Sequence, residues 1–314
     1  RTIEGIVELV LIEWKYTEQY LADERALGLI EPEYRPKATE TIPEMIEIIR
    51  TLVERGSAYE TEDGVYFSVE TFPSYGALSG NTLEQLNAGA RIEVNERKRH
   101  PADFALWKKT VGSNAKHLLK WPSPWGEGFP GWHIECSAMS RKHLGLTVDI
   151  HTGGEDNIFP HHECEIAQSE CSGSHPFVRY WLHRRRIEIV AREDGHDDAG
   201  AAKMSKSLGN VLSIDDIIAR GYSPMDLRYL LLSVHYRTRL KFSWKGMDDA
   251  KRARLRILEW MTEMEERFGC KSPTELPTLL RHTSSPYIDQ FRAAMDDDLN
   301  VSAALATVFD TITQ

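Results

Sequence analysis

Residues 132–165 constrain the fold more than any other stretch, because they combine helix signals with metal-binding side chains. Pro160 suits the first position of a helix, where its fixed φ and missing N–H cost nothing. On that helix, His161 and Glu165 would project from one face. Cys136 can join them if residues 147–150 form a strand that carries the chain back past it. Such a Cys/His/Glu cluster suits Zn²⁺, although this spacing alone is more often a solvated helix face.

Residues 203–207, with the sequence Lys-Met-Ser-Lys-Ser, are the second landmark. A given pentapeptide is rare by chance in a chain of this length, so this is a strong signal among short motifs. Serine and glycine surround Lys203 and Lys206, and we expect both lysines on a mobile loop. The alternative is an exposed basic loop without a role.

Composition excludes several classes of protein. With 314 residues, 41% of them hydrophobic and 27% charged, the chain has an ordinary globular balance and room for two or three structural units. No apolar run approaches the roughly 20 residues that cross a bilayer. The four cysteines do not show the disulfide framework of a small secreted domain, so the reducing cytoplasm is the expected location. A net charge of −10 argues against a protein that binds nucleic acid over its whole surface, but it is compatible with a local basic face.

The order of elements predicts a mixed α/β protein. Helical spacing covers residues 2–27 and 41–56, and Asp63-Gly64 indicates a hairpin. Residues 102–109 alternate as an edge strand would, whereas residues 121–131 are rich in Pro, Gly and Trp and predict a loop. Ser213 and Ser223 are predicted helix caps. Amphipathic helices are expected over residues 247–268 and 286–312.

Four segments together resemble the cysteinyl-tRNA synthetases, a family of class I aminoacyl-tRNA synthetases. They are residues 131–139 (GWHIECSAM), 153–156 (GGED), 159–168 (FPHHECEIAQ) and 203–207 (KMSKS). Their order is that of the family, and the similarity extends over nearly the whole chain. The resemblance implies an α/β fold: a class I Rossmann-like nucleotide-binding domain, incomplete here, with an inserted α+β module and a C-terminal α-helical part.

The resemblance also implies five parts. Residues 1–56 would be the helical end of the first half of the nucleotide-binding fold, and residues 57–125 the inserted connective module. Residues 126–210 would be the second half, with the zinc site and the KMSKS loop. Residues 211–246 would contact the tRNA stem, and residues 247–314 would begin a helical bundle. Basic residues in the stem-contact part fit phosphate docking, which is electrostatic. They are Arg228, His235, Arg237, Arg239 and Lys241.

In this family one zinc ion is held by two cysteines, a histidine and a glutamate. The matching positions here are Cys136, His161 and Glu165, and the first cysteine has no counterpart. Zinc binds a thiolate far better than a hydroxyl, so cysteine would be selected over serine by bond chemistry. Trp132 and His151 match residues that wall the cysteine pocket. For His151 the alternative is a hydrogen-bonded histidine at a strand end.

ATP is the expected second substrate, with Mg²⁺. Gly154 and Asp156 follow a predicted strand, where the crevice of an open α/β sheet binds nucleotides, and Asp156 could accept hydrogen bonds from a ribose. Lys203 and Lys206 would neutralise the charge that builds on the phosphates when a carboxylate attacks ATP. The family assigns the ATP contact to the second lysine, here Lys206.

The resemblance implies a cysteine–tRNA ligase that forms cysteinyl-adenylate and transfers cysteine to tRNA(Cys). It further implies a cytoplasmic monomer without membrane contact. The chain lacks the family's histidine signature and an anticodon-binding unit, so we expect a fragment that is inactive alone. Cys164 is a candidate replacement for the missing zinc ligand. Two alternatives remain, a cysteine:amino-sugar ligase of the mycothiol pathway and a non-catalytic protein that binds RNA or a partner.

Overall fold

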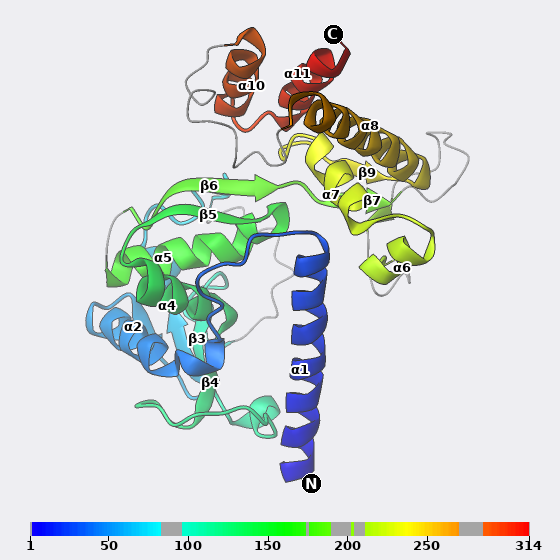
Figure 1. Cartoon of the computed structure of the whole chain (residues 1–314). Coiled ribbons are helices and arrows are strands. Elements are labelled where there is room, and N and C mark those ends of the chain that lie inside the picture. The colour runs from blue at the N-terminus through cyan, green and yellow to red at the C-terminus, as the bar shows by residue number, and fades with distance from the viewer. Residues whose placement is uncertain are drawn as a thin grey trace. The chain divides into compact units, whose positions relative to one another are not determined.

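The computed structural model describes residues 2–82, 96–173, 176–189, 202–203, 211–269 and 285–313, with the backbone alone for 2–9 and 202–203. Two compact units emerge (Figure 1). Unit 1 comprises Arg1–Tyr16 and Glu31–His183, and unit 2 comprises Thr17–Ile30 and Arg184–Gln314. The helix predicted at the start of the chain is α1 (Thr2–Ala26), which contributes to both units. Among the described residues, none of the helices has the length and apolar character that a bilayer crossing requires.

Unit 1 contains a four-stranded antiparallel sheet in the order β1-β2-β3-β4. Its strands are β1 (Ala58–Glu60), β2 (Gly64–Phe67), β3 (Phe104–Lys109) and β4 (Gly128–Pro130). The predicted hairpin at Asp63-Gly64 is confirmed by the pairing of β1 with β2. The prediction that residues 102–109 form an edge strand is wrong, because β3 lies between β2 and β4. Alternation on this strand reflects two unequal faces and not a free edge. Short single turns are η1 (Ala38–Glu40), η2 (Val69–Thr71) and η3 (Gly112–Asn114).

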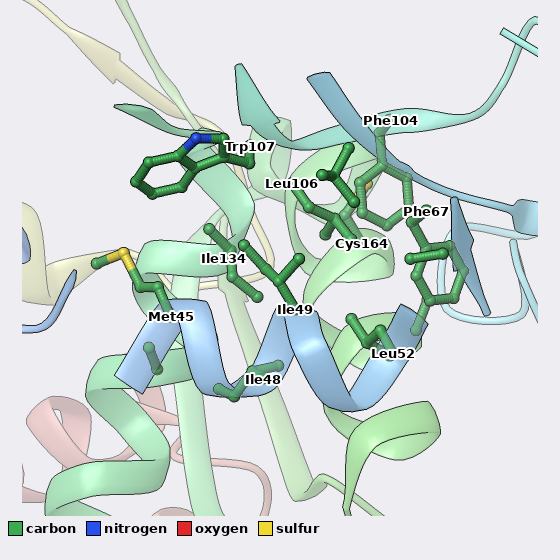
Figure 2. Packing of buried hydrophobic residues seen from close by; sticks show 14 of the residues in the cluster. Met45, Ile48, Ile49, Leu52, Phe67, Phe104, Leu106, Trp107, Ile134 and Cys164 are labelled. Carbon is green, nitrogen blue, oxygen red and sulfur yellow. The ribbon is translucent and has the colours of Figure 1, made fainter. Parts of the chain in front are cut away.

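The core of unit 1 forms where one face of α2 (Ile42–Glu54) packs against side chains of the sheet and of two other helices (Figure 2). Pro43 stands in its first turn, and Gly56 follows its end with a φ of 78°. The buried face of α2 meets side chains from β2, β3 and α4 (Trp132–Leu144). Full burial of each large apolar side chain contributes about 1.5–3 kcal/mol. The labelled members of this core are Met45, Ile48, Ile49, Leu52, Phe67, Phe104, Leu106, Trp107, Ile134 and Cys164.

A second sheet in unit 1 leads into the segment with metal-binding side chains. It consists of β5 (Val148–Gly154) and β6 (Val178–Arg184). The chain then passes through η4 (Glu155–Asn157) and η5 (Ile158–His162) into α5 (Glu163–Ser172). Phe159, the residue before Pro160, has extended backbone angles inside η5, and His162 and Glu163 are helical, which agrees with the helix predicted to begin at Pro160.

Unit 2 combines a three-stranded sheet with helices. In the order β8-β7-β9, β7 (Ile187–Ile189) pairs antiparallel with β8 (Ala202–Lys203) and parallel with β9 (Leu240–Phe242). The caps predicted at Ser213 and Ser223 are confirmed as capping boxes that begin α6 (Ile214–Ala219) and α7 (Pro224–Ser233). The remaining helices are α8 (Trp244–Phe268), α10 (Pro286–Asp296) and α11 (Val301–Thr313).

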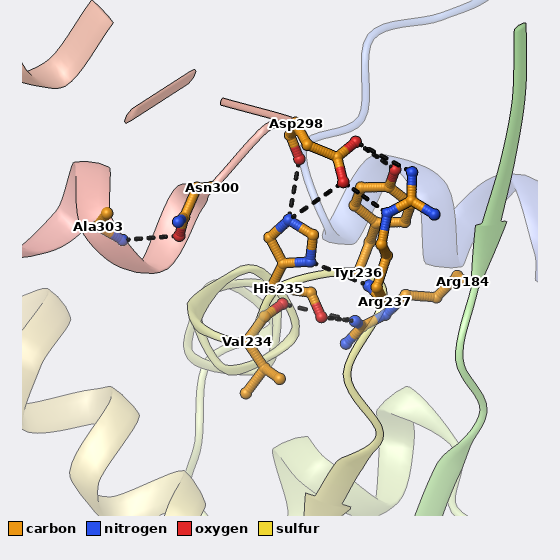
Figure 3. Close-up of polar contacts among 8 residues, drawn as sticks. All are labelled: Arg184, Val234, His235, Tyr236, Arg237, Asp298, Asn300 and Ala303. Carbon is orange, nitrogen blue, oxygen red and sulfur yellow. Dashed lines mark hydrogen bonds and ion pairs between the residues drawn. The ribbon is translucent and has the colours of Figure 1, made fainter. Parts of the chain in front are cut away.

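The helix predicted over residues 286–312 is divided into α10 and α11 by a turn with left-handed backbone at Asp298 and Leu299. Asp298 fastens this turn to the segment after α7 (Figure 3). Its carboxylate accepts hydrogen bonds from Tyr236 Oη at 2.6 Å and from the Arg237 guanidinium, and its carbonyl lies 2.9 Å from His235 Nε2. These contacts position the turn without help from glycine.

Candidate metal centre

Three side chains predicted as zinc ligands converge in unit 1. Cys136 comes from α4, His161 from η5 and Glu165 from α5. One potential ligand atom of each lies within 4.8 Å of those of the other two. Packing of α4 on α5 brings Cys136 to the pair, and helical spacing sets His161 Nε2 2.7 Å from Glu165 Oε1. The donors therefore occupy positions from which they could bind one ion.

The carboxylate of Glu165 is fully buried and sits between two histidines. Its Oε1 lies near His161, and its Oε2 lies 3.0 Å from His151 Nε2. Despite these short distances, neither oxygen has an aligned hydrogen-bond donor. Burial raises the pKa of this carboxyl, but the two imidazoles outweigh burial and hold the pKa at about 2. A buried carboxylate without aligned donors is costly unless a cation completes its surroundings.

The same carboxylate also affects the pKa of the Cys136 thiol. Burial raises its pKa to about 12, and the negative charge of Glu165 adds to the shift. Without a cation this thiol is protonated at neutral pH. A metal ion at the cluster would favour the thiolate and offset the repulsion from Glu165. Cys136 offers a sulfur ligand, His161 a nitrogen and Glu165 an oxygen, and this set of ligand atoms fits Zn²⁺. The absence of aligned hydrogen-bond donors to the two Glu165 oxygens fits the same ion.

Additional histidines surround the cluster, and the sequence analysis did not identify them. His133 Nδ1 lies 2.8 Å from His161 Nδ1, and His162 Nδ1 lies 2.8 Å from His183 Nε2. His151, His162 and Glu165 form a second group whose potential ligand atoms lie within 4.8 Å of one another. Burial, reinforced by neighbouring imidazoles, lowers the pKa values of His133 and His162 to about 4, so both rings are neutral at pH 7. The signal in the sequence was the placement of histidines beside the predicted site residues Trp132 and His161.

The two residues predicted to wall a cysteine pocket both border the donors. Trp132 is 58% exposed, and its indole stacks on the His161 ring at 4.1 Å between centroids. His151, on β5, contacts the Trp181 ring edge to face at 4.8 Å. An apolar surface therefore lies directly beside the polar cluster.

Gly154 and Asp156 lie at the end of β5 and in η4, as the strand prediction requires. A Cβ atom at Gly154 would come within 2.5 Å of Asp156 Oδ1, so glycine lets this carboxyl approach the backbone. Asp156 is exposed and able to accept further hydrogen bonds.

The predicted lysine loop is described only at its first residue. Lys203 lies in β8, where its backbone pairs with Glu188. The expectation that Lys203 itself belongs to a loop is therefore wrong. Lys206 lies outside the described residues.

Cys164 does not point into the donor cluster. It is fully buried, and its sulfur lies 3.4 Å from the hydroxyl of Tyr75. Burial raises the pKa of this thiol well above its usual range. Neither of the two groups of potential ligands includes Cys164, which argues against the idea that it replaces a missing zinc ligand.

Most of the predicted basic strip in unit 2 has intramolecular partners. Arg237 pairs with Asp298, Arg239 Nη1 lies 3.1 Å from Glu188 Oε1, and Arg228 donates to backbone carbonyls of the chain after α1. Lys241 is exposed on β9. Phosphate docking by this strip would require the arginines to exchange partners, or would rest on Lys241.

Comparison with known proteins places this chain in a family. The family described as the class I (C) tRNA synthetase catalytic domain matches residues 7–252, and the DALR domain matches residues 290–314. A cysteine–tRNA ligase of Thermus thermophilus is 44% identical over 295 residues, which are 94% of this chain and 58% of that protein. The enzyme of the same name from Geobacter sulfurreducens is 46% identical over 311 residues, which are 98% of this chain and 61% of that protein. This chain thus spans about three fifths of the length of these relatives.

Solved structures confirm the predicted fold class. Mycobacterium tuberculosis methionyl-tRNA synthetase in complex with methionyl-adenylate matches with a TM-score of 0.59 at 14% identity, over 94% of this chain and 67% of that one. The apo form of the same synthetase matches with a TM-score of 0.60 at 11% identity, over 98% of this chain and 70% of that one. At such low identity these matches establish the class I synthetase fold alone.

Proposed function

Because the chain belongs to the cysteinyl-tRNA synthetase family, we propose that it provides the cysteine-selecting part of a cysteine–tRNA ligase. The reaction uses ATP with Mg²⁺ to convert cysteine into cysteinyl-adenylate and then transfers cysteine to the 3′ end of tRNA(Cys). The proposed partners are cysteine, ATP and tRNA(Cys), for a monomer in the cytoplasm.

Cys136, His161 and Glu165 would hold one Zn²⁺ ion. The observation that carries this proposal is the surroundings of the buried Glu165 carboxylate. A cysteine sulfur and a histidine nitrogen, both ligands of zinc, lie close to it, and neither of its oxygens has an aligned hydrogen-bond donor. When bound, zinc supplies a borderline-soft centre that prefers a thiolate to a hydroxyl. Cysteine would thereby be separated from serine without an editing step.

The protein's own side chains would orient the amino acid. Glu165 lies close to the imidazoles of both His151 and His161 and would hold the two rings in place beside the pocket. Trp132 stacks on His161 and would shield the thiol group from water. His133 and His162, neutral at pH 7, would add hydrogen bonding without adding positive charge.

The nucleotide would lie beside this pocket. Asp156 is exposed and would accept hydrogen bonds from ribose hydroxyls, while Gly154 keeps the backbone accessible. Lys203 and Lys206 would neutralise charge on the phosphates as pyrophosphate leaves. These four assignments follow from the family motifs.

The decisive experiment compares Cys136→Ala with Cys171→Ala, a matched control whose cysteine belongs to neither donor group. Zinc content would be measured by atomic emission, and binding of cysteine and serine by calorimetry. We expect the unchanged chain and Cys171→Ala to hold one zinc ion and prefer cysteine. We expect Cys136→Ala to lose both properties. Full zinc content and an unchanged preference for cysteine in Cys136→Ala would overturn the proposal.

A further inference from the structure

Gln168 is fully buried on α5 and donates hydrogen bonds to α4. Its amide Nε2 lies 2.9 Å from the backbone carbonyl oxygen of His133 and 3.0 Å from Ser137 Oγ. Both acceptors belong to one turn of α4, and Cys136 lies in that turn. A single side chain on α5 therefore holds the part of α4 that carries the proposed sulfur ligand.

Gln168 also lies beside the ligands that precede it in the sequence. It follows Glu165 by three residues and His161 by seven, and side chains at these spacings project from one face of a helix. The potential ligand atoms of Cys136, His161 and Glu165 lie within 4.8 Å of one another, although Cys136 comes from a different helix. The Gln168 amide therefore bridges the two faces whose separation determines whether these ligands can reach one ion.

Small side chains allow the two helices to pack closely. Ser137 and Ala138 on α4 and Ala167 on α5 are fully buried, and Ser169 Oγ lies 3.3 Å from Ser137 Oγ. Small apolar surfaces define the register of two helices weakly, because they can slide past one another. Hydrogen bonds weaken steeply when their angle changes. The amide of Gln168 therefore fixes the register that packing alone would leave free.

The oxygen of the same amide is not satisfied. Gln168 Oε1 is buried and has no hydrogen-bond partner within the described part of the chain. Turning the amide over would place this oxygen against the His133 carbonyl, where two acceptors repel, so the two N–H bonds determine the orientation. A buried acceptor without a partner costs free energy, and an apolar side chain of similar shape would avoid this cost. The amide therefore contributes more through the position that it gives α4 than through stability.

We propose that Gln168 is a positioning residue for the metal centre, which acts through α4 and sets the distance from Cys136 to His161 and Glu165. The inference rests on the zinc site proposed above. It adds a residue that belongs to neither group of potential ligands. Hydrogen bonds from residues outside the ligand set orient the ligands, and their loss generally weakens metal binding by about 10–100-fold.

The test compares Gln168→Met, which removes both donors with little change in volume, with Ser172→Ala as the matched control. Ser172 is also buried on α5, but its hydroxyl donates to the carbonyl of Ser169 within that helix. A third variant, Ser137→Ala, removes one of the two acceptors and keeps the His133 carbonyl.

Three measurements are made on each variant of the full chain. Zinc affinity is measured by competition with a chromophoric chelator. Co²⁺ in place of zinc reports ligation by the Cys136 thiolate through sulfur-to-metal charge-transfer absorption. The urea midpoint without metal reports stability, which a purely structural role of Gln168 would change.

We expect Gln168→Met to bind zinc about 10–100-fold more weakly and to lose most of the charge-transfer absorption, with a urea midpoint close to that of the unchanged chain. Ser137→Ala should show a smaller loss of zinc affinity, and it decides the question if Gln168→Met does not fold. Ser172→Ala should bind zinc as the unchanged chain does.

Two results would overturn the inference, and they are distinguishable. Unchanged zinc affinity and absorption in every folded variant of Gln168 and Ser137, with or without a lower urea midpoint, would overturn the positioning role alone. Failure of the unchanged chain to bind zinc would overturn the proposed metal site and the positioning role with it.

Discussion

Glu163 provides a stringent test of how the metal-bearing helix is held. Its side chain is fully buried, and its oxygens accept hydrogen bonds from the backbone N–H groups of Gly76 at 3.0 Å and Ser79 at 2.6 Å. Glu163 stands between His161 and Glu165 in the sequence. The two bonds therefore fix the start of α5 to the loop around residues 75–80.

Replacing Glu163 with alanine should destabilise unit 1 by about 2–5 kcal/mol. Each N–H left without an acceptor costs about 1–3 kcal/mol, and relief of a buried charge offsets part of the total. Glu163→Gln should also destabilise the fold, because one acceptor becomes an NH₂ group that faces an N–H donor. The direction of the glutamine effect is the informative result.

Urea denaturation followed by tryptophan fluorescence measures both variants, with Glu47→Gln as the control. Glu47 is exposed on α2, and its replacement should change stability by less than about 0.5 kcal/mol. If Glu163→Gln is as stable as the unchanged chain or more so, the buried carboxylate does not stabilise the attachment of α5. The reasoning about α5 would then be wrong.

Three more predictions concern other parts of the molecule. Hydrogen bonds from Arg237 and Tyr236 lower the pKa of Asp298 from its ordinary 3.8 to about 2, so its stabilisation is complete above the ordinary value and is lost as the pH falls toward 2. Asp298→Asn should therefore be less stable than the unchanged chain at pH 6 in urea titrations, with the difference vanishing near pH 2. Arg254→Met removes the partner of buried Asp226, 2.6 Å away, and should destabilise unit 2 by about 2–3 kcal/mol; no change in the urea midpoint would contradict this. Leu52→Ala empties a fully buried position of α2 and should cost about 2–5 kcal/mol by the same assay, whereas a loss below about 1 kcal/mol would mean that the core is not packed as described.

Local spacing made part of the metal centre predictable. His161 and Glu165 share a helix face because four residues make about one turn, and the break at Phe159 lies before both of them. The approach of Cys136 depends on α4 packing against α5, which no local spacing encodes. The sequence placed Cys136 in the cluster only on the condition that residues 147–150 form a strand, and β5 meets that condition. His133, His162 and His183 were missed because their contacts join residues 21 or more positions apart.

Boundaries between elements were harder to predict for a related reason. The apolar periodicity of residues 286–312 continues through Asp298, and no glycine marks the left-handed turn that separates α10 from α11. Contacts from Tyr236 and Arg237 stabilise that turn, and they lie far away in sequence. Likewise, alternation on β3 could not reveal that β4 would cover its second edge. The division into five domains remains a prediction.

One carboxylate serving two histidines has an evolutionary consequence. Because Glu165 touches His151 through one oxygen and His161 through the other, a change at either ring alters the electrostatic setting of its counterpart. Substitutions at these three positions should be epistatic, with double mutants departing from the sum of single effects. Lineages that replace one member would then need to exchange the others in concert.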